Sequence, residues 1–234
     1  MTATPPVNKN RLPNGITREV LEQDGLRAAI RELYPDVRMH DDDFLRTSIA
    51  QTLAMAPAQA ARVDGVWLFG YGSLLWNPCV PVAQWLRGRV HGYHRGFRIR
   101  LTHGRGSPDR PGLMLGLGPG GSCTGMGLRI DADDLAHELL MVWRREMLTG
   151  VYQPRWVWLH TEQGRLPAMT FVTDTHSHSY CGALDRAEIV RLLASGHGVL
   201  GSCVEYLDST VAQLDANGIH DHHLHALQAQ VAVA

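Results

Sequence analysis

A glycine-rich turn directly after a short apolar segment is the first place in this sequence where chemistry could occur. Residues 66–69, Val-Trp-Leu-Phe, suit a buried strand, and two glycines then interrupt the run. Because glycine lacks Cβ, a ligand can approach the main chain there, and successive N–H groups can form a concavity that suits a carboxylate. A plain turn after a strand has the same spacing. The residues we expect to bind substrate are Gly70, Tyr71, Gly72, Ser73, Leu74 and Leu75.

A second candidate is an acid on the apolar face of a helix predicted over 132–148. At 100° per residue, Glu146 continues the stripe formed by Leu135, Leu139 and Val142, whereas Arg144 points the opposite way. A carboxylate on the inward face is desolvated, which raises its pKa toward the range of a general base. The alternative is an ion pair between Glu146 and Arg145 or another arginine at the helix end.

The elements that must position these residues change character along the chain. Apolar and alternating stretches predict strands over 66–70, 88–101, 112–117, 124–130, 155–160 and 167–173. Gly118-Pro119-Gly120-Gly121-Ser122 separates the third strand from the fourth and predicts a plain hairpin loop. Helical spacing predicts helices over 132–148, 185–195 and 203–216 and a last one from about His220, and Gly196 takes the C′ position after the second.

The segment before the first strand has a different pattern. Residues 1–15 read as a loose tail, and residues 16–60 show helical spacing that Pro35 interrupts and that resumes after the acids at 41–43. We expect a tail and helical extension over 1–60, packed on the domain or acting as a lid, and a catalytic domain over 61–234. Strands and helices do not alternate as in a parallel sheet, so the expected fold class is α+β, a small, mainly antiparallel β-barrel with surrounding helices.

The composition is that of an ordinary soluble globular protein. The 234 residues are 44% hydrophobic and 19% charged, with a formal net charge of −1. Arginines are scattered among acids and the longest apolar stretches are about half a bilayer span, so we expect no nucleic-acid or membrane partner. Residues 1–15 lack the apolar core of a secretory signal. The dispersed cysteines favour buried thiols in a reduced, cytoplasmic protein, and they are Cys79, Cys123, Cys181 and Cys203.

Two further patterns match cofactor or metal sites in residue type and spacing. Gly116-x-Gly118-x-x-Gly121 matches a dinucleotide-binding fingerprint, but Pro119 lies inside it and a strand is predicted after it, so we reject a nucleotide site. Histidines at i and i+3 can chelate zinc, yet no cysteine or carboxylate shares the spacing of those near the C-terminus. We therefore assign no metal and no cofactor, and leave metal binding by this cluster open. Its members are His220, His222, His223 and His225, and His176 forms a separate pair with His178.

Four motifs follow one another in an order that points to one family. The first is Phe-Gly-Tyr-Gly-Ser-Leu-Leu-Trp-Asn-Pro at 69–78, and the third is Trp-Arg-Arg-Glu-Met at 143–147 with Thr149-Gly150 and Tyr152. The second and fourth are Gly-Arg-Gly at 104–106 with Pro-Gly at 111–112, and Glu-Tyr-Leu at 205–207. Together they resemble the ChaC family of glutathione-specific γ-glutamylcyclotransferases, over about 66–230. Cys203 departs from the asparagine expected three residues before Tyr206, which puts a hydrogen bond from that side chain in doubt.

The resemblance implies the same barrel fold and, with the two candidates above, a reaction. The turn after residue 69 holds the α-carboxylate of a γ-glutamyl group, and the substrate's α-amine attacks its own γ-carbonyl beside Glu146. The carboxylate first takes a proton from the ammonium and then delivers one to the leaving amide nitrogen, which gives 5-oxoproline and, from glutathione, Cys-Gly. No metal or cofactor is required. We expect Arg105 to reach the glycyl carboxylate and Tyr206 to line the substrate site.

Two other functions stay open. A non-enzymatic regulatory or binding protein, as the family's link to cation transport suggests, would be expected to lose the acid, whereas Glu146 is present. A cyclotransferase for another γ-glutamyl amine would keep residues 71–74 and Glu146 and differ in the loops around Arg105 and Pro154. The expected partner is a small molecule, glutathione, bound by a monomer or weak dimer.

Overall fold

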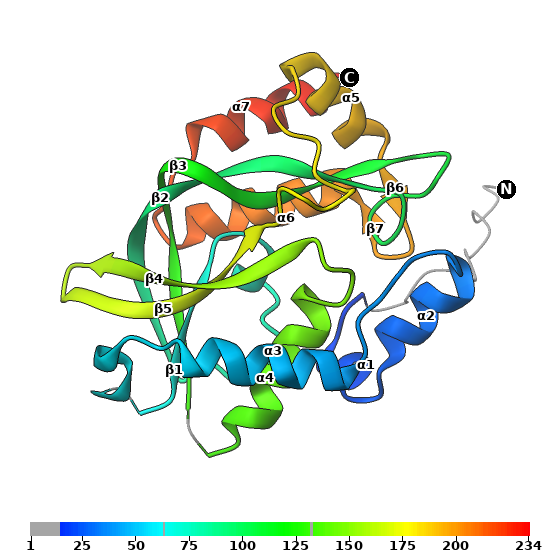
Figure 1. Ribbon diagram of the computed structural model, residues 1–234. Helices are drawn as coiled ribbons and strands as arrows, with labels where there is room; N and C mark the ends of the chain where they lie inside the picture. Colours follow the sequence, from blue (N-terminus) through cyan, green and yellow to red (C-terminus); the bar gives the residue numbers. More distant parts are fainter. Residues whose placement is uncertain (1–14, 63, 132) are drawn as a thin grey trace, which may run out of the picture.

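A closed five-stranded β-barrel forms the core of the protein in a computed structural model that describes residues 15–62, 64–131 and 133–234 (Figure 1). The strands close in the order β1-β3-β2-β4-β5, and every neighbouring pair is antiparallel except β1 with β5. The predicted α+β class and mainly antiparallel barrel are therefore confirmed. The strands are β1 (Val66–Gly70), β2 (Gln84–Leu101), β3 (Gly112–Ile130), β4 (Tyr152–Thr161) and β5 (Gly164–Thr173).

Alternation along the strands fills the barrel. Side chains in a strand point to opposite faces in turn, so every second residue can face the interior. On β2 the predicted alternating set is buried, and on β3 an alternating set is buried as well. β1 is buried at all five positions, as its unbroken apolar run predicts. The buried alternating residues are Phe97, Ile99 and Leu101 on β2 and Leu113, Leu115 and Leu117 on β3.

The predicted hairpin loop at 118–122 is wrong. β3 runs without a break from Gly112 to Ile130 and pairs with β2 on both sides of this stretch, with Tyr93 opposite Pro119 and His91 opposite Ser122. The register shifts between His91 and Tyr93, so the glycine-rich stretch is accommodated at a bulge. Gly120 and Gly121 have φ values of 91° and 69°, which glycine adopts without the clash that a Cβ would cause. The chain reverses instead at 102–111, the segment that carries Arg105.

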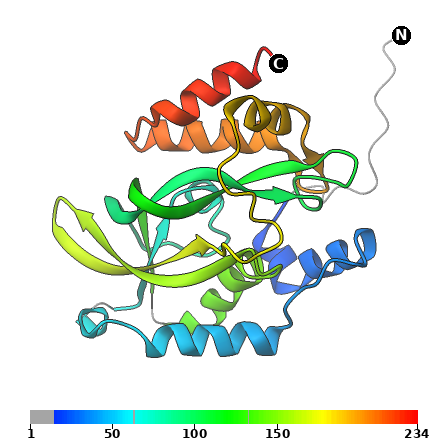
Figure 2. The same cartoon turned by 45° about the horizontal axis from the view of Figure 1, so that its top comes forward.

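Helices cover the barrel on two sides. In Figures 1 and 2, α5, α6 and α7 gather on one side, while α1 to α4 lie on the other. The helices predicted over 132–148, 185–195, 203–216 and from about 220 are all found, with ends shifted by up to three residues. Their bounds are α1 (Arg18–Glu22), α2 (Gly25–Leu33), α3 (Asp42–Ala54), α4 (Leu135–Glu146), α5 (Arg186–Ser195), α6 (Cys203–Ala216) and α7 (His222–Val231). Two 3₁₀ turns, η1 (Ala58–Arg62) and η2 (Ser73–Leu75), and a two-residue strand pair, β6 (His197–Gly198) with β7 (Gly201–Ser202), complete the fold.

Gly196 ends α5, but not in the conformation expected of a C′ glycine. Its φ is −64°, outside the left-handed region. A Cβ at this position would lie 2.7 Å from the Gly112 Cα and 2.8 Å from the Cys203 Sγ. The glycine is therefore required by close packing between α5, β3 and α6 rather than by a left-handed turn.

In its described part, from residue 15 onward, the N-terminal extension contains three α-helices rather than two. Asp24 adopts a left-handed φ of 56°, which divides the first predicted helix into α1 and α2. The second predicted helix is α3, whose N-cap Asp41 accepts a hydrogen bond from the Phe44 amide. The expected loose tail falls almost wholly on residues outside the described ranges. No helix in the described ranges is both long and apolar enough to cross a bilayer.

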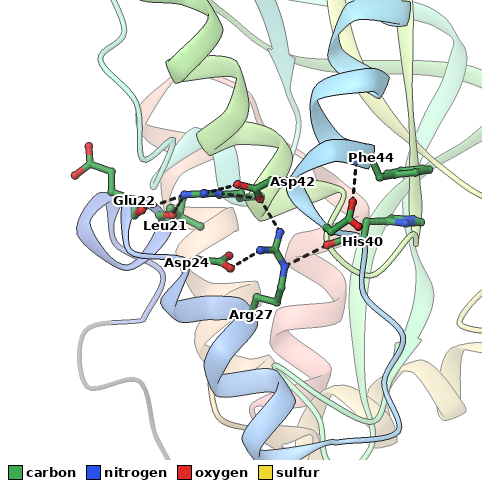
Figure 3. Close-up of polar contacts among 9 residues, drawn as sticks. Leu21, Glu22, Asp24, Arg27, His40, Asp42 and Phe44 are labelled. Carbon is green, nitrogen blue, oxygen red and sulfur yellow. Dashed lines mark hydrogen bonds and ion pairs between the residues drawn. The ribbon is translucent and has the colours of Figure 1, made fainter.

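A polar network fastens this extension to α4 (Figure 3). The Arg144 guanidinium, on the last turn of α4, donates to the Asp42 carboxylate and to the Leu21 carbonyl oxygen at 2.6 Å. Arg27 donates to Asp42 at 2.8 Å and to the His40 carbonyl at 3.2 Å. A second bridge joins Arg18 to both oxygens of Glu138, each at 2.7 Å. The extension is thus held against the helix that carries Glu146.

Candidate active site

The turn after β1 is held by its own backbone hydrogen bonds and lies against Tyr206 of α6. Gly72 precedes the 3₁₀ turn η2, in which the Leu75 and Asn77 amides bond back to the Gly72 and Ser73 carbonyls. The first amides of such a turn have no partner within it, so they remain available to an acceptor. A Cβ at Gly72 would lie 3.0 Å from the Tyr206 hydroxyl. The absent side chain therefore makes room for Tyr206 as well as for a ligand.

Glu146 is the last residue of α4, and its side chain is 11% exposed. Burial raises the pKa of its carboxyl above the usual glutamate value, and the charge of Arg145 partly offsets this rise. The Arg145 Nε lies 2.8 Å from Oε1 of Glu146, and this guanidinium also donates to the Asn77 carbonyl after η2. The predicted inward-facing acid and the alternative ion pair with Arg145 are therefore both present. The ion pair links the acid to the turn that follows β1.

Three buried tyrosines surround this carboxylate. Tyr71 donates its hydroxyl to the Phe171 carbonyl at 2.8 Å, and Tyr152 donates to the Leu115 carbonyl at 2.7 Å. Burial raises the pKa of all three phenols, and the charge of Glu146 adds to the rise; the pKa of Tyr206 reaches about 12. The phenols are therefore neutral at physiological pH and can act as hydrogen-bond donors.

Two adjoining cavities meet at these residues. The larger has a volume of about 160 Å³, enough for a small organic ligand, and the smaller of about 10 Å³ suits about one water-sized group. The residues that line both are Ser73, Glu146, Tyr152 and Tyr206. Tyr71, Gly72 and Leu74 line only the smaller cavity, and Arg105 only the larger. Gly70 and Leu75 line neither among the described residues; both are buried in the core behind the turn.

Arg105 enters the larger cavity from the loop that joins β2 to β3. Its guanidinium lies 5.2 Å from the centre of the Tyr206 ring and 5.8 Å from that of Trp76, and it donates to the Ser202 carbonyl at 3.2 Å. Burial lowers the pKa of this guanidinium. A largely buried cation held by aromatic faces favours an anionic ligand that can accept its remaining N–H groups. The Cys203 thiol, where an asparagine was expected, contacts the Arg105 carbonyl oxygen at 3.4 Å and so still supports this loop.

Sequence reasoning missed several residues of the larger cavity as site residues, among them Tyr152 and His103. Tyr152 was noted only as part of a motif, although it lines both cavities beside Glu146. His103 lines the larger cavity, and its Nδ1 is buried with no hydrogen-bond partner among the described residues. Burial lowers the pKa of His103, so its imidazole is neutral. The position of His103, two residues before Arg105, was the one available signal in the sequence.

The glycines of the rejected nucleotide fingerprint do not precede a helix, and the cysteines, expected to be buried thiols, are buried at only two of four positions. Gly116, Gly118 and Gly121 all lie within β3, so no helix follows them. All four cysteines are free thiols; Cys123 and Cys203 are buried, and Cys79 and Cys181 are half-buried.

Comparison with known proteins adds the family. The family described as ChaC-like protein matches residues 66–234. A glutathione-specific γ-glutamylcyclotransferase of Escherichia coli (strain K12) is 39% identical over 185 residues, which are 79% of this chain and 78% of that protein. Glutathione-specific γ-glutamylcyclotransferase 1 of Homo sapiens is 29% identical over 73% of this chain and 82% of its own. The crystal structure of a yeast γ-glutamylcyclotransferase specific to glutathione shares the fold, with a TM-score of 0.67 at 21% identity over 73% of this chain and 97% of that chain.

Proposed function

The chain belongs to the ChaC-like family, and we propose that it is a γ-glutamylcyclotransferase that degrades glutathione to 5-oxoproline and Cys-Gly. The single observation that carries the proposal is the position of Glu146. This carboxylate is buried, lines both adjoining cavities and has a raised pKa. Those are the properties of a general base in a site that excludes bulk water.

The reaction needs one proton acceptor and a folded substrate. Glu146 takes a proton from the α-ammonium, and the amine nitrogen then bonds to the γ-carbonyl carbon of the same glutamyl unit. As the bond from that carbon to the cysteinyl nitrogen breaks, Glu146 returns the proton to the leaving nitrogen. The ring nitrogen gives up its second proton, which the released amine takes, so 5-oxoproline keeps one N–H and Cys-Gly leaves as an ammonium. Both reacting groups belong to one molecule, so orientation alone supplies much of the rate: well-oriented ring closures reach effective molarities of about 10⁵ M or more.

The remaining site residues have roles that follow from their charge and position. Ser73, whose backbone begins η2, lines both cavities and can bind the glutamyl α-carboxylate or the developing oxyanion. Tyr152 and Tyr206 hold neutral hydroxyls beside Glu146. Arg105, at the far wall, is positioned for the carboxylate at the glycyl end of glutathione.

The N-terminal extension supplies part of the wall of the larger cavity. Its contribution is mostly apolar, and the Asn77 side chain donates to the Ile16 carbonyl at 2.7 Å where the two segments meet. We assign residues up to 60 to an accessory unit that closes the cavity and residues from 61 onward to the catalytic domain. The extension residues at the wall are Gly15, Ile16, Leu26 and Ile30.

Cellular context follows from the same chemistry. The substrate is a thiol tripeptide, and the protein's own four cysteines are free, which supports a reducing compartment and hence a cytoplasmic location. We further propose that the protein acts as a monomer or weak dimer.

The experiment that tests this proposal incubates the purified protein with glutathione and identifies products by mass spectrometry. We expect 5-oxoproline and Cys-Gly in equal amounts. Glu146→Gln should retain the fold but turn over about 10²–10⁴-fold more slowly, because the amide cannot take up the ammonium proton. A folded Glu146→Gln protein with near-normal activity would remove the assigned base.

The same assay separates the two alternatives. A non-enzymatic binding protein would leave glutathione intact, and a cyclotransferase for another γ-glutamyl amine would form 5-oxoproline from that amine faster than from glutathione. Arg105 distinguishes the substrates further. Arg105→Gln should slow turnover of glutathione more than that of a γ-glutamyl amine without a terminal carboxylate.

A further inference from the structure

A cluster of one carboxylate and two imidazoles lies where α6 ends and α7 begins. Asp215 is in the last turn of α6, His220 lies in the connecting segment, and His225 is in the first turns of α7. One potential ligand atom from each residue lies within 4.8 Å of the other two. None of the three lines either active-site cavity, so the cluster is a separate feature of the molecule.

We propose that these three residues, the α6–α7 histidine site, bind a zinc-class divalent ion that joins the two helices. His225 Nε2 lies 2.9 Å from one Asp215 carboxylate oxygen, and His220 Nδ1 lies 3.5 Å from the other. Ligand bonds of about 2.0–2.2 Å place adjacent ligand atoms about 3–3.5 Å apart around a zinc ion. The two carboxylate–imidazole separations, measured to different oxygens of Asp215, are close to this range, and modest side-chain rotation would bring one oxygen and both imidazoles around a single ion.

The hydrogen bonding of His225 prepares one ring nitrogen for a metal. Its Nδ1 lies 2.8 Å from the Asp221 carbonyl oxygen, which can only accept, so Nδ1 carries a hydrogen. Once Nε2 is deprotonated, its lone pair faces Asp215 and His220. A ligating histidine whose other nitrogen donates to a backbone carbonyl is the usual arrangement of a metal site.

Asp221 is itself held in place, which makes this support rigid. Its carboxylate accepts from the amides of His223 and Leu224 at the start of α7 and forms an ion pair with Arg95 at 3.1 Å. The Arg95 side chain is only 5% exposed and also donates to the Tyr71 carbonyl at 2.7 Å. The carbonyl that fixes the His225 ring is therefore anchored to the barrel.

The donor set selects the class of ion. Two imidazoles and one carboxylate suit zinc and its neighbours in the transition series, whereas magnesium and calcium prefer oxygen ligands alone. His222, whose ring centre lies 4.5 Å from that of His220, can supply a fourth ligand, and water can otherwise complete the shell. Sequence spacing did not indicate this carboxylate, because Asp215 lies five residues before His220 and in a different helix from His225.

The test uses the full-length protein without an affinity tag, stripped of metal with a chelator and titrated with zinc chloride in a calorimeter. We expect one equivalent to bind. Asp215→Asn and His225→Gln should each lower the association constant by at least about tenfold, since even the loss of an outer hydrogen-bond partner weakens metal sites by about 10–100-fold. His223→Gln is the matched control, because His223 contacts Arg186 outside the cluster and should bind zinc normally.

Thermal unfolding gives a second measurement that does not depend on enzymatic activity. An ion that binds only the folded protein raises the melting temperature, so zinc should stabilise the wild type and His223→Gln but not Asp215→Asn. All three substituted residues are at least partly exposed, and circular dichroism checks that the variants fold. The proposal is overturned if the wild type shows no saturable binding near one equivalent, or if Asp215→Asn and His225→Gln bind zinc as tightly as the wild type.

Discussion

At the scale of single residues, the chemistry depends on how one carboxylate is balanced between burial and a neighbouring charge. Burial raises the pKa of Glu146 and Arg145 lowers it, so the acid is a stronger base than an exposed glutamate yet can still ionise. Helical phase predicted the inward direction of Glu146. Helical phase could not decide whether this carboxylate lines a cavity or pairs with Arg145. Consecutive helical residues do not face each other, and only the long Arg145 side chain brings the two groups together.

This balance predicts a shift in the pH profile of Arg145→Gln. Removing the guanidinium takes away the charge that lowers the pKa of Glu146, so burial raises that pKa further. The reaction needs the ionised carboxylate, so the fall in activity on acidification should begin at a correspondingly higher pH. The measurement is kcat against pH, with the exposed Arg191→Gln as control. An unchanged acid limb in Arg145→Gln would show that Glu146 is not the titrating base.

The turn after β1 makes a second prediction at this scale. Gly72→Ala would place a methyl group 3.0 Å from the Tyr206 hydroxyl, while its φ of −142° lies outside the left-handed region. Tyr206 must move within the site, so we expect KM to rise about tenfold while the melting temperature falls by only about 2–4 °C, the equivalent of about 1 kcal/mol.

The contrasting variant for Gly72→Ala is Gly116→Ala. A Cβ at Gly116 would lie 2.0 Å from the Thr173 Oγ1 within the barrel, away from both cavities, so this change should lower the melting temperature without a selective effect on KM. If Gly72→Ala behaves in the same way as Gly116→Ala, the glycine serves packing alone.

At the scale of elements, sequence patterns predicted most strands and helices correctly. The prediction failed at a glycine-rich stretch whose composition fits both a turn and a bulge. Periodicity located the helices α4 to α7, because one buried face imposes a regular pattern, whereas an unbroken apolar run located β1. The stretch 118–122 has the composition of a hairpin loop, yet it forms a bulge inside β3. Glycine tolerates a turn and a bulge equally well, and only pairing with the distant β2 decides between them.

The contact between α3 and α4 predicts a pH-dependent loss of stability in Asp42→Asn. Hydrogen bonds from Arg144 and then Arg27 hold the pKa of Asp42 at about 2, below its usual 3.8. A lowered pKa in the folded state stabilises the fold above the unfolded pKa, and this stabilisation is lost as the pH falls from about 4 to about 2. At pH 7, Asp42→Asn should lower the free energy of unfolding by about 1–3 kcal/mol, as expected for hydrogen bonds to a charged group.

Chemical denaturation at pH 7 and at acid pH checks this prediction. The difference between wild type and Asp42→Asn should shrink as the pH approaches 2. Asp43→Asn, an exposed acid in the same helical turn, serves as the control and should match the wild type throughout. An Asp42→Asn protein as stable as the wild type at pH 7 would mean that the network does not hold the extension in place.

At the scale of the whole molecule, the site is assembled from segments that are distant in the chain. The turn after β1, the loop before β3, the end of α4, the start of α6 and the N-terminal extension all reach the larger cavity. The sequence motifs identified one candidate site residue in most of these segments. They did not reveal that Ile16 and Leu26 complete the wall, because an amphipathic helix looks the same whether its apolar face covers a core or a cavity.

This assembly predicts that the extension contributes to substrate binding. Ile16→Ala removes apolar surface from the cavity wall and should raise KM for glutathione about five- to tenfold with little change in kcat, equivalent to about 1 kcal/mol of lost burial. The control is Met55→Ala, since Met55 ends the extension's last helix, is 63% exposed and does not line the cavity. Equal KM values for the two variants would confine the extension to a structural role.

The most direct test of the central claim, attack by the substrate's own amine, compares glutathione with glutathione acetylated at that nitrogen. The acetylated compound keeps the amide to be cleaved but lacks the ammonium that Glu146 deprotonates, and its nitrogen lone pair is delocalised. We predict 5-oxoproline from glutathione and no product from the acetylated compound at any concentration, both measured by mass spectrometry. Free glutamate from glutathione, or release of N-acetylglutamate, would show attack by water or an enzyme nucleophile and contradict the cyclotransferase mechanism.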